Sequence, residues 1–169
     1  MNWTRVLPSC LGVALVFASV AVLAATSDRW TQANGSGVCQ AALPNYEGQI
    51  RKRPLAIQNE GTANAFISCS PVSFQSAPAT TRGYQITVAN RSDAAVSVTC
   101  TAVIGGDMWW AGTYIPQTLI VPADDYSTFI FDGNTPGFHT HAPFNLSCNI
   151  PPGVGLGSFY TGQFVQVGE

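Results

Sequence analysis

Val96–Ile104 (VSVTCTAVI) and Phe144–Ile150 (FNLSCNI) are the two stretches that decide the fold of this 169-residue chain. In both, apolar residues alternate with Ser, Thr or Asn. Because successive side chains of a strand point to opposite faces, Cys100 and Cys148 fall on the apolar face of their strands. Two half-buried strands with inward cysteines predict a disulfide across the core of a β-sandwich.

The N-terminus has the pattern of an export signal. Arg5 supplies a positive charge, residues 11–23 form an apolar run, and small residues near Ala24 or Ala25 offer a cleavage site. The run is too short for a confident membrane span, and no later segment replaces it. We therefore expect residues 1–25 to be a signal peptide, residues 26–38 a flexible arm, and residues 39–169 one domain.

Charge is sparse in this chain, at 9% of residues. Residues 26–169 contain six basic and nine acidic side chains, a formal net charge of −3. This balance gives no electrostatic footprint for nucleic acid. The one concentrated charge is residues 51–53 (RKR). These residues could meet an anionic surface or a polysaccharide, but we interpret them as a solvated strand edge that discourages pairing between sheets.

Four cysteines remain after the signal: Cys39, Cys69, Cys100 and Cys148. An even number in an exported chain predicts two disulfides and an oxidising compartment, periplasmic or extracellular. Three connectivities are open, of which we favour Cys39–Cys69 with Cys100–Cys148. No CxxC pair is present to support a redox or zinc site.

Short alternating segments between turn residues predict about eight strands and no long helix. Residues 54–58 and 65–70 have the pattern of one hairpin, with Leu55 and Ile57 on the same face. Residues 84–90 and 96–104 have the pattern of a second hairpin. Further strands are expected at residues 118–121, 127–131, 144–150 and 158–167, with a bulge at Gly162. The fold class is all-β: a single-domain, two-sheet antiparallel sandwich, immunoglobulin-like or jelly-roll in type.

The chain resembles a loose group of small exported bacterial β proteins with four cysteines and a Pro-Pro-Gly step before the last strand. The residues that carry the resemblance are Cys39, 59–62 (NEGT), 68–69 (SC), 96–103 (VSVTCTAV), 129–132 (FIFD) and 146–153 (LSCNIPPG). The resemblance implies export and a compact β domain. It transfers no functional residue.

Trp109 and Trp110, with Tyr114 nearby, form the aromatic cluster of greatest functional interest. Neighbouring residues of a strand face opposite ways, so one indole can pack in the core while the other meets solvent. An exposed indole can stack on a sugar ring or anchor a protein interface. The structural alternative is that one packs inside and the other covers a sheet edge.

His139 and His141 have the i, i+2 spacing that places two imidazoles on one face of a strand. A metal site would need a further ligand from Asp124, Asp125 or Asp132. The alternative to a metal site is that both histidines lie exposed in a loop and bind no metal. For hydrolysis, no GxSxG motif is present, and nothing in the sequence places two carboxylates across a cleft.

The sequence therefore favours a non-enzymatic exported binding or cell-surface interaction module without a cofactor, with Trp109, Trp110 and Tyr114 as the ligand-binding residues. Its partner would be a glycan or an extracytoplasmic protein, not nucleic acid. One alternative is a small secreted hydrolase or metalloenzyme that uses His139 and His141. Another is a structural or assembly protein of the cell envelope that works through its sheet edges.

Overall fold

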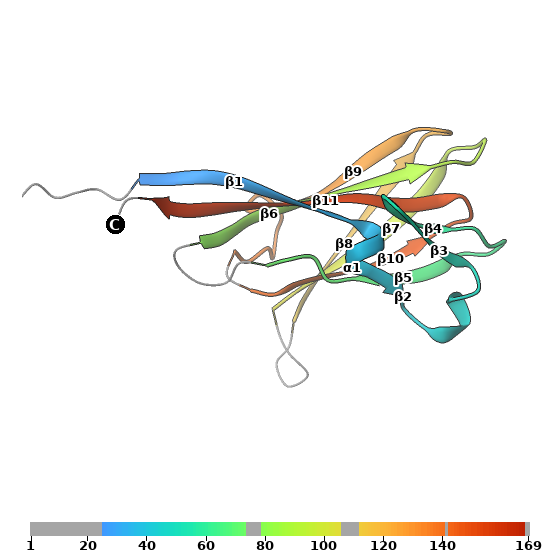
Figure 1. Cartoon of the computed structure of the whole chain (residues 1–169), viewed down its shortest axis with the longest axis horizontal. Coiled ribbons are helices and arrows are strands. Elements are labelled where there is room, and N and C mark those ends of the chain that lie inside the picture. The colour runs from blue at the N-terminus through green and yellow to red at the C-terminus, as the bar shows by residue number, and fades with distance from the viewer. Residues whose placement is uncertain (1–24, 74–78, 106–111, 141, 168–169) are drawn as a thin grey trace, which may run out of the picture.

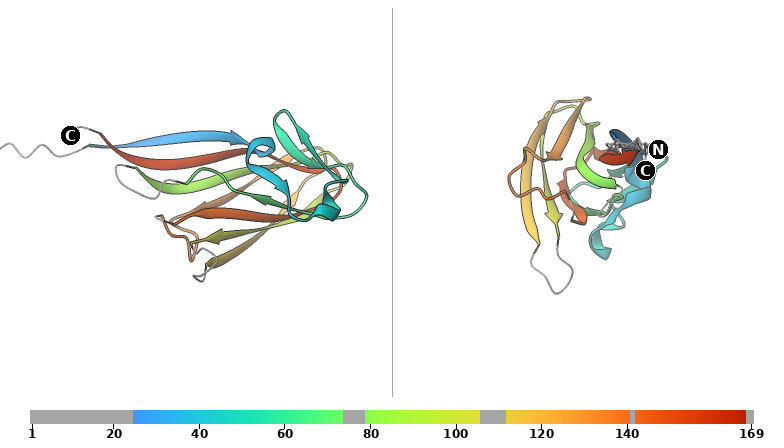
Figure 2. Two further views of the ribbon diagram at one scale, coloured as in Figure 1. Left: turned by 60° about the horizontal axis from the view of Figure 1, so that its bottom comes forward. Right: turned by 90° about the vertical axis from the view of Figure 1, so that its left-hand side faces the viewer.

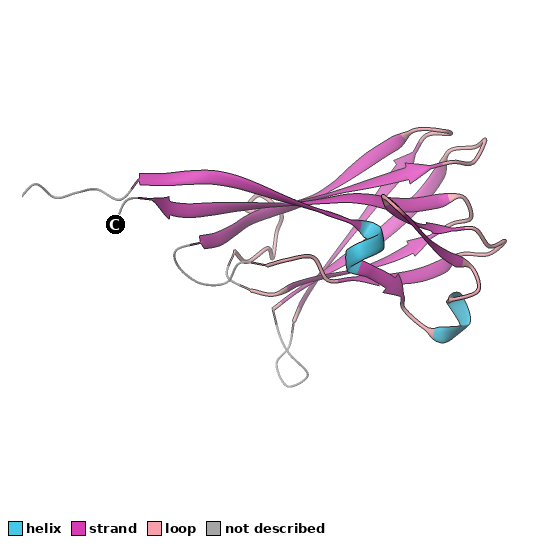
Figure 3. Cartoon of the chain, viewed as in Figure 1, coloured by secondary structure: helices cyan, strands magenta, loops and turns pink. Residues whose placement is uncertain are grey.

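A computed structural model describes residues 25–73, 79–105, 112–140 and 142–167. The described residues form eleven strands and two short helices (Figures 1 and 3). The first half of the chain contains β1 (Ala25–Asn34), α1 (Gly35–Val38), β2 (Cys39–Ala41), η1 (Pro44–Tyr46), β3 (Ile50–Arg53), β4 (Ala56–Asn59), β5 (Ala65–Cys69) and β6 (Ala79–Asn90). The second half contains β7 (Val96–Ile104), β8 (Thr113–Val121), β9 (Tyr126–Asp132), β10 (Phe144–Ile150) and β11 (Val154–Val167).

The strands form two antiparallel sheets packed face to face, which confirms the predicted sandwich (Figure 2). The larger sheet has the order β3-β4-β11-β6-β9, with β1 also paired to β11. The smaller sheet has the order β2-β5-β10-β7-β8. In both views, β1 and β11 run past the strands of the smaller sheet (Figures 1 and 2). In the part of the chain that the structure describes, no helix is long and apolar enough to cross a membrane.

The core lies where the alternation places it. The apolar residues of β10 are buried, and so are Val98, Cys100, Ala102 and Ile104 of β7 and Phe129 and Phe131 of β9. At its centre the rings of Tyr84 and Phe144 stack with centroids 3.8 Å apart, which joins β6 of one sheet to β10 of the other. Burial of the aromatic rings supplies much of the driving force for closing the two sheets.

Both favoured disulfides, Cys39–Cys69 and Cys100–Cys148, are present. Their location corrects the expectation of a bridge across the core. Each joins directly opposed residues of neighbouring strands in the smaller sheet, with Cα atoms 4.0 and 4.1 Å apart. Such short separations are typical of antiparallel pairs that exchange no backbone hydrogen bonds. The disulfides therefore fix the register of β2 against β5 and of β7 against β10 within the smaller sheet.

Both predicted hairpins are wrong. Strand β4 lies in the larger sheet and β5 in the smaller, and the same holds for β6 and β7. The short turns between them cross from one sheet to the other. Leu55 is also not on the buried face, because it lies in the β3–β4 turn and is 71% exposed, whereas Ile57 is buried. Residues 51–53 do form a strand at the edge of their sheet, as expected.

Two fully buried asparagines, Asn59 and Asn90, hold these crossing turns together. Each occupies the last position of a strand in the larger sheet. Each side-chain amide donates to a carbonyl of its own turn and to a carbonyl of the smaller sheet. The accepting carbonyls are those of Ala63 (2.8 Å) and Ile150 (2.9 Å) for Asn59, and of Ala94 (2.7 Å) and Val121 (3.3 Å) for Asn90.

Residues 25–34 form a regular strand, β1, where the sequence led us to expect a flexible arm. All ten residues pair with β11, from Ala25 opposite Val167 to Asn34 opposite Ser158. The polar composition that indicated an arm has a physical reason. Strand β1 lies at a sheet margin, and most of its side chains on both faces are exposed, so it shows no apolar alternation.

The five strands of the smaller sheet contain no Asp, Glu, Lys, Arg or His. Their outward positions carry hydroxyls and amides, among them Thr99, Thr101 and Ser147, together with a few exposed apolar side chains such as Phe66 and Ile120. The two flanks of the sandwich, where the edge strands of one sheet lie beside those of the other, also differ. On one flank β8 and β9 are in contact, and the side-chain amide of Gln117 donates to the carbonyl of Ile130 (2.9 Å).

Candidate functional site

The aromatic cluster predicted from the sequence is only partly described. Trp109 and Trp110 lie outside the described residues. Tyr114 lies on β8, at the edge of the smaller sheet, with 70% of its side chain exposed. A contact surface at these three residues therefore stays a prediction.

The predicted metal ligands are not brought together within the described residues. His139 is exposed in the irregular connection between β9 and β10, so the same-face argument for a strand does not apply to it. His141 lies outside the described residues. Asp124 is in the β8–β9 turn and pairs with Arg91 (3.2 Å). Among described residues, no group of three His, Cys, Asp or Glu side chains could hold a metal ion.

A different site is built by the outer face of the larger sheet, where two glycines lie side by side. Trp30 of β1 is opposite Gly162 of β11, Gly162 is opposite Gly83 of β6, and Gly83 is opposite Asp132 of β9. The row therefore reads Trp30, Gly162, Gly83, Asp132 across four strands. Two positions without side chains leave a hollow between the indole and the carboxylate.

The indole of Trp30 forms one wall of this hollow. A Cβ atom placed on Gly162 would lie 2.9 Å from the nearest atom of the indole, so the ring lies directly over that glycine. The indole is nonetheless 48% exposed. A half-exposed indole held against a sheet offers solvent a rigid apolar surface with a polar edge.

The next row along the same strands closes the hollow with an amide and an apolar side chain. It contains Gln32, Tyr160, Gln85 and Ile130, each opposite the next. We call the resulting cavity of about 140 Å³ the glycine trough. Its lining residues include Trp30, Arg82, Gly83, Gln85, Ile130 and Asp132. This volume is below the roughly 300–1,000 Å³ of pockets for drug-sized ligands, so the trough suits a single ring.

Charged groups surround the trough without neutralising one another completely. Arg82 forms an ion pair with Asp28 and lies 5.4 Å from the ring centroid of Phe164. The carboxylate of Asp132 accepts hydrogen bonds from the backbone N–H (2.9 Å) and the side-chain amide (3.4 Å) of Asn134, and a carboxylate can accept more bonds than these two. One cation and two anions give the site a formal charge of −1, which disfavours an acidic ligand.

The side-chain amide of Gln85 is the polar group best placed to contact a ligand. It lies in the second row, half-buried, and no other described residue hydrogen-bonds to it. The trough thus combines an aromatic wall, a free amide, a carboxylate and a guanidinium around one ring-sized space.

Sequence reasoning missed this site because its main side chain, Trp30, was assigned to an arm. The two glycines that form the floor are in strands separated by almost eighty positions, so their adjacency depends on sheet register. One signal was available. A glycine within the last strand was expected to mark a bulge, and a register shift follows Gly162. Glycine within a strand also marks close approach of another group.

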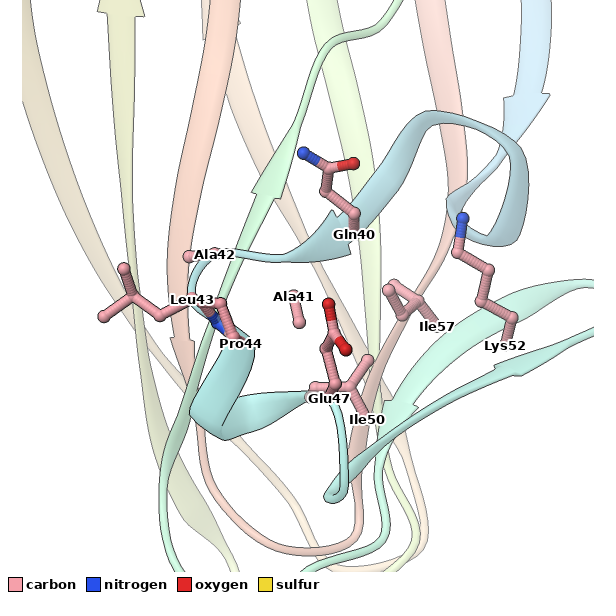
Figure 4. Close-up of a pocket in the computed structure, with 9 residues that line it drawn as sticks. All are labelled: Gln40, Ala41, Ala42, Leu43, Pro44, Glu47, Ile50, Lys52 and Ile57. Carbon is pink, nitrogen blue, oxygen red and sulfur yellow. The ribbon is translucent and has the colours of Figure 1, made fainter.

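A second hollow lies between β2, η1, β3 and β4 (Figure 4). Its volume is about 300 Å³, and its lining includes Ala41, Ile50 and Ile57. Gln40, Glu47 and Lys52 provide polar side chains around it. Of its lining residues, only Lys52 was singled out from the sequence, as part of the charged residues 51–53.

Comparison with known proteins gives a likeness of fold without a family. No protein-family model matches the sequence, and no curated protein does. Similar solved structures include a C-terminal family 6 carbohydrate-binding module of a laminarinase from Zobellia galactanivorans, with TM-score 0.46, 11% identity and coverage of 82% of this chain and 100% of that one. Another is a family 11 carbohydrate-binding module from Clostridium thermocellum in complex with a mixed-linked tetrasaccharide (TM-score 0.39, 7% identity, 84% and 90% coverage).

A mutant family 29 carbohydrate-binding module is similar at TM-score 0.39 and 16% identity, over 83% of this chain and 85% of that one. The likeness is one of general two-sheet architecture and transfers no residue or ligand. The chain is an all-β, two-sheet antiparallel sandwich with two disulfides, which is consistent with an extracytoplasmic protein. Of the resemblance to small exported four-cysteine proteins, the compact β domain is confirmed, and the likeness to that group itself stays a prediction.

Proposed function

We propose that the protein is a non-enzymatic carbohydrate-binding module and that the glycine trough holds one sugar ring against Trp30. The observation that carries the proposal is the half-exposed indole fixed over Gly162 beside a ring-sized space. A pyranose has apolar C–H faces and hydroxyls around its edge. The indole matches the face, and the side chains of Gln85 and Asp132 match the edge.

The charge of the site narrows the ligand class. Arg82 is already paired with Asp28, and Asp132 adds a net negative charge. We therefore propose neutral sugars over uronic acids or sulfated glycans. Because the trough is small and open, affinity depends on one stacking contact and a few hydrogen bonds, and additional rings lie along the neighbouring row toward Tyr160 and Gln32.

The test is binding of the oxidised protein, residues 26–169, to soluble β-glucan, xylan, galactan and mannan, with alginate as the acidic comparison. Affinity electrophoresis and calorimetry measure the binding. Trp30→Ala should weaken binding to the preferred neutral polymer at least about tenfold, or about 1.4 kcal/mol. It should leave Tm nearly unchanged, because half of the side chain is already in solvent. Trp30→Phe should retain part of the affinity.

The matched control is Tyr114→Ala, which removes an exposed aromatic side chain from the other sheet. If Tyr114→Ala abolishes binding and Trp30→Ala does not, the trough is not the site, and the predicted surface of Trp109, Trp110 and Tyr114 is supported instead. Binding to none of the neutral polymers would refute the proposal. Release of reducing ends from them would support the hydrolase alternative.

A further inference from the structure

The flank of the sandwich opposite β8 and β9 is open. Here β2, at the edge of the smaller sheet, lies across from β3, at the edge of the larger one. The space between them is the hollow of about 300 Å³ shown in Figure 4. A further hollow of about 320 Å³ adjoins it, and Gln40 and Lys52 line both. We call the two together the flank groove.

Backbone groups of β2 face this groove without a partner. The N–H of Ala42 donates to the carbonyl of Phe66 (2.9 Å), and the N–H of Ser70 donates to the carbonyl of Val38 (2.9 Å). In an antiparallel pair the bonded positions alternate, so these bonds direct the N–H and C=O of the intervening Ala41 away from β5. No described residue hydrogen-bonds to the N–H or C=O of Ala41.

The floor and the rim of the groove have different chemistry. Ala41 and Ile50 form an apolar floor above the fully buried Ile57. Figure 4 shows the carboxylate of Glu47 directed into the hollow, with the ammonium of Lys52 at a different part of its rim. Neither charged group has an ion-pair partner among the described residues. The rim therefore presents one free anion and one free cation above an apolar surface.

We infer that the flank groove binds an extended peptide, which adds as a short strand beside β2. The peptide backbone exchanges hydrogen bonds with the backbone of Ala41, and one apolar side chain of the peptide lies on the side chains of Ala41 and Ile50. A basic side chain of the peptide meets Glu47, and an acidic one meets Lys52. Because β2 has only three residues, addition is limited to a short segment, and the charges select its sequence.

The experiment uses the oxidised protein and a positional library of hexapeptides that are acetylated and amidated, so that terminal charges are absent. Fluorescence anisotropy ranks the peptides by their affinity for the protein. The protein concentration is raised to about 1 mM, so that weak binding is still detected. The wild type should prefer Lys or Arg at one position and Asp or Glu at another. The double variant Glu47→Lys with Lys52→Glu should reverse that preference, since both side chains are exposed and their exchange preserves net charge.

Backbone pairing is tested separately by hydrogen exchange. The best peptide should slow exchange of the Ala41 amide at least about tenfold, because a free edge amide becomes hydrogen-bonded. The same peptide with alternate backbone nitrogens methylated should bind at least about tenfold more weakly. An unchanged Ala41 exchange rate, or a preference that survives the charge exchange, would overturn the inference.

Two further outcomes are decisive. Protection of Ala41 that rises with protein concentration in the absence of peptide would assign the groove to a second copy of the chain and reject a peptide partner. Trp30→Ala should leave peptide binding unchanged, because the trough and the groove share no residue. Failure of peptide binding is therefore distinguishable from failure of carbohydrate binding.

Discussion

The indole of Trp30 occupies the space that any side chain at Gly162 would need. The distance from a Cβ atom at position 162 to the nearest ring atom would be 2.9 Å, which is shorter than real contacts allow. The two residues are 132 positions apart and meet because β1 and β11 pair in register. Gly162 is therefore part of the site although it has no side chain.

Gly162→Ala should displace the indole and weaken carbohydrate binding at least about fivefold, or about 1 kcal/mol. Tm should change little, because the displaced group is the far end of an exposed side chain. Calorimetry with the preferred polymer and tryptophan emission spectra measure the two effects. The control is Gly157→Ala on the same strand, where a Cβ atom would meet its nearest neighbour at an ordinary 3.8 Å. Equal binding by the two variants would contradict the assigned position of Trp30.

Alkaline pH should destabilise the protein through Tyr84. Burial raises the pKa of its hydroxyl above the ordinary value of 10.0, despite a hydrogen bond to Ser73 that acts in the opposite direction. Below pH 10 the tyrosine is protonated in both the folded and the unfolded state, so it does not make the free energy of unfolding depend on pH. Above it the unfolded state loses the proton first, so the free energy of unfolding falls as pH rises toward the folded-state pKa.

Denaturant titrations at a series of pH values from 8 to about 11 measure this slope. Tyr84→Phe should remove the part of it that this hydroxyl contributes. Tyr126→Phe is the control, since that side chain is 66% exposed. The same slope in wild type and Tyr84→Phe would show that other groups cause the alkaline loss.

Removal of the buried amide at position 90 should be severely destabilising. Asn90→Ala removes the side-chain donor to the carbonyls of Val121 and Pro122, at about 1–3 kcal/mol for each unsatisfied group. We expect a loss of about 2–4 kcal/mol in the free energy of unfolding, measured by urea titration, and a similar loss for Asn59→Ala. Asn145→Ala, at an exposed position, should cost less than about 1 kcal/mol.

Each disulfide should stabilise the fold by a similar amount. The bridged residues are 30 and 48 positions apart in sequence. In the loop-entropy description, closing loops of these lengths restricts the unfolded chain by about 3.5–4 kcal/mol each. The paired variant Cys100→Ala with Cys148→Ala should lose about that much in denaturant titrations. A loss below about 1 kcal/mol would show that the unfolded chain is already restricted there.

The sequence correctly predicted which residues of the strands are buried, but it did not predict which strands pair with each other in a sheet. Alternation in β7 and β10 identified the inward residues correctly, because one face of each strand is buried and the other faces solvent. It contains no information on which sheet a strand joins. The chain crosses between sheets at Asn59 and Asn90, and a short polar turn has the same composition whether it closes a hairpin or spans two layers.

The candidate site was the least predictable part. Trp30 belongs to a strand with both faces largely exposed, so no periodicity marked it, and Gly83 and Gly162 become neighbours only through register. The favoured disulfide pairing was confirmed, but its placement was not, because two inward cysteines can oppose each other across a core or along one sheet. The predictions for Trp109, Trp110, Tyr114, His139 and His141 stay predictions.

The charge-free strands of the smaller sheet divide the molecule into two halves that respond differently to their surroundings. These strands contain no carboxylate, ammonium, guanidinium or imidazole group, and their cysteines are all in disulfides. Salt and acid therefore act on the larger sheet and the turns, while the disulfide-bonded half keeps the same electrostatic state. A change of pH or salt concentration, of the kind an extracytoplasmic protein meets, would therefore alter the charge of one half of the molecule and leave that of the other half unchanged.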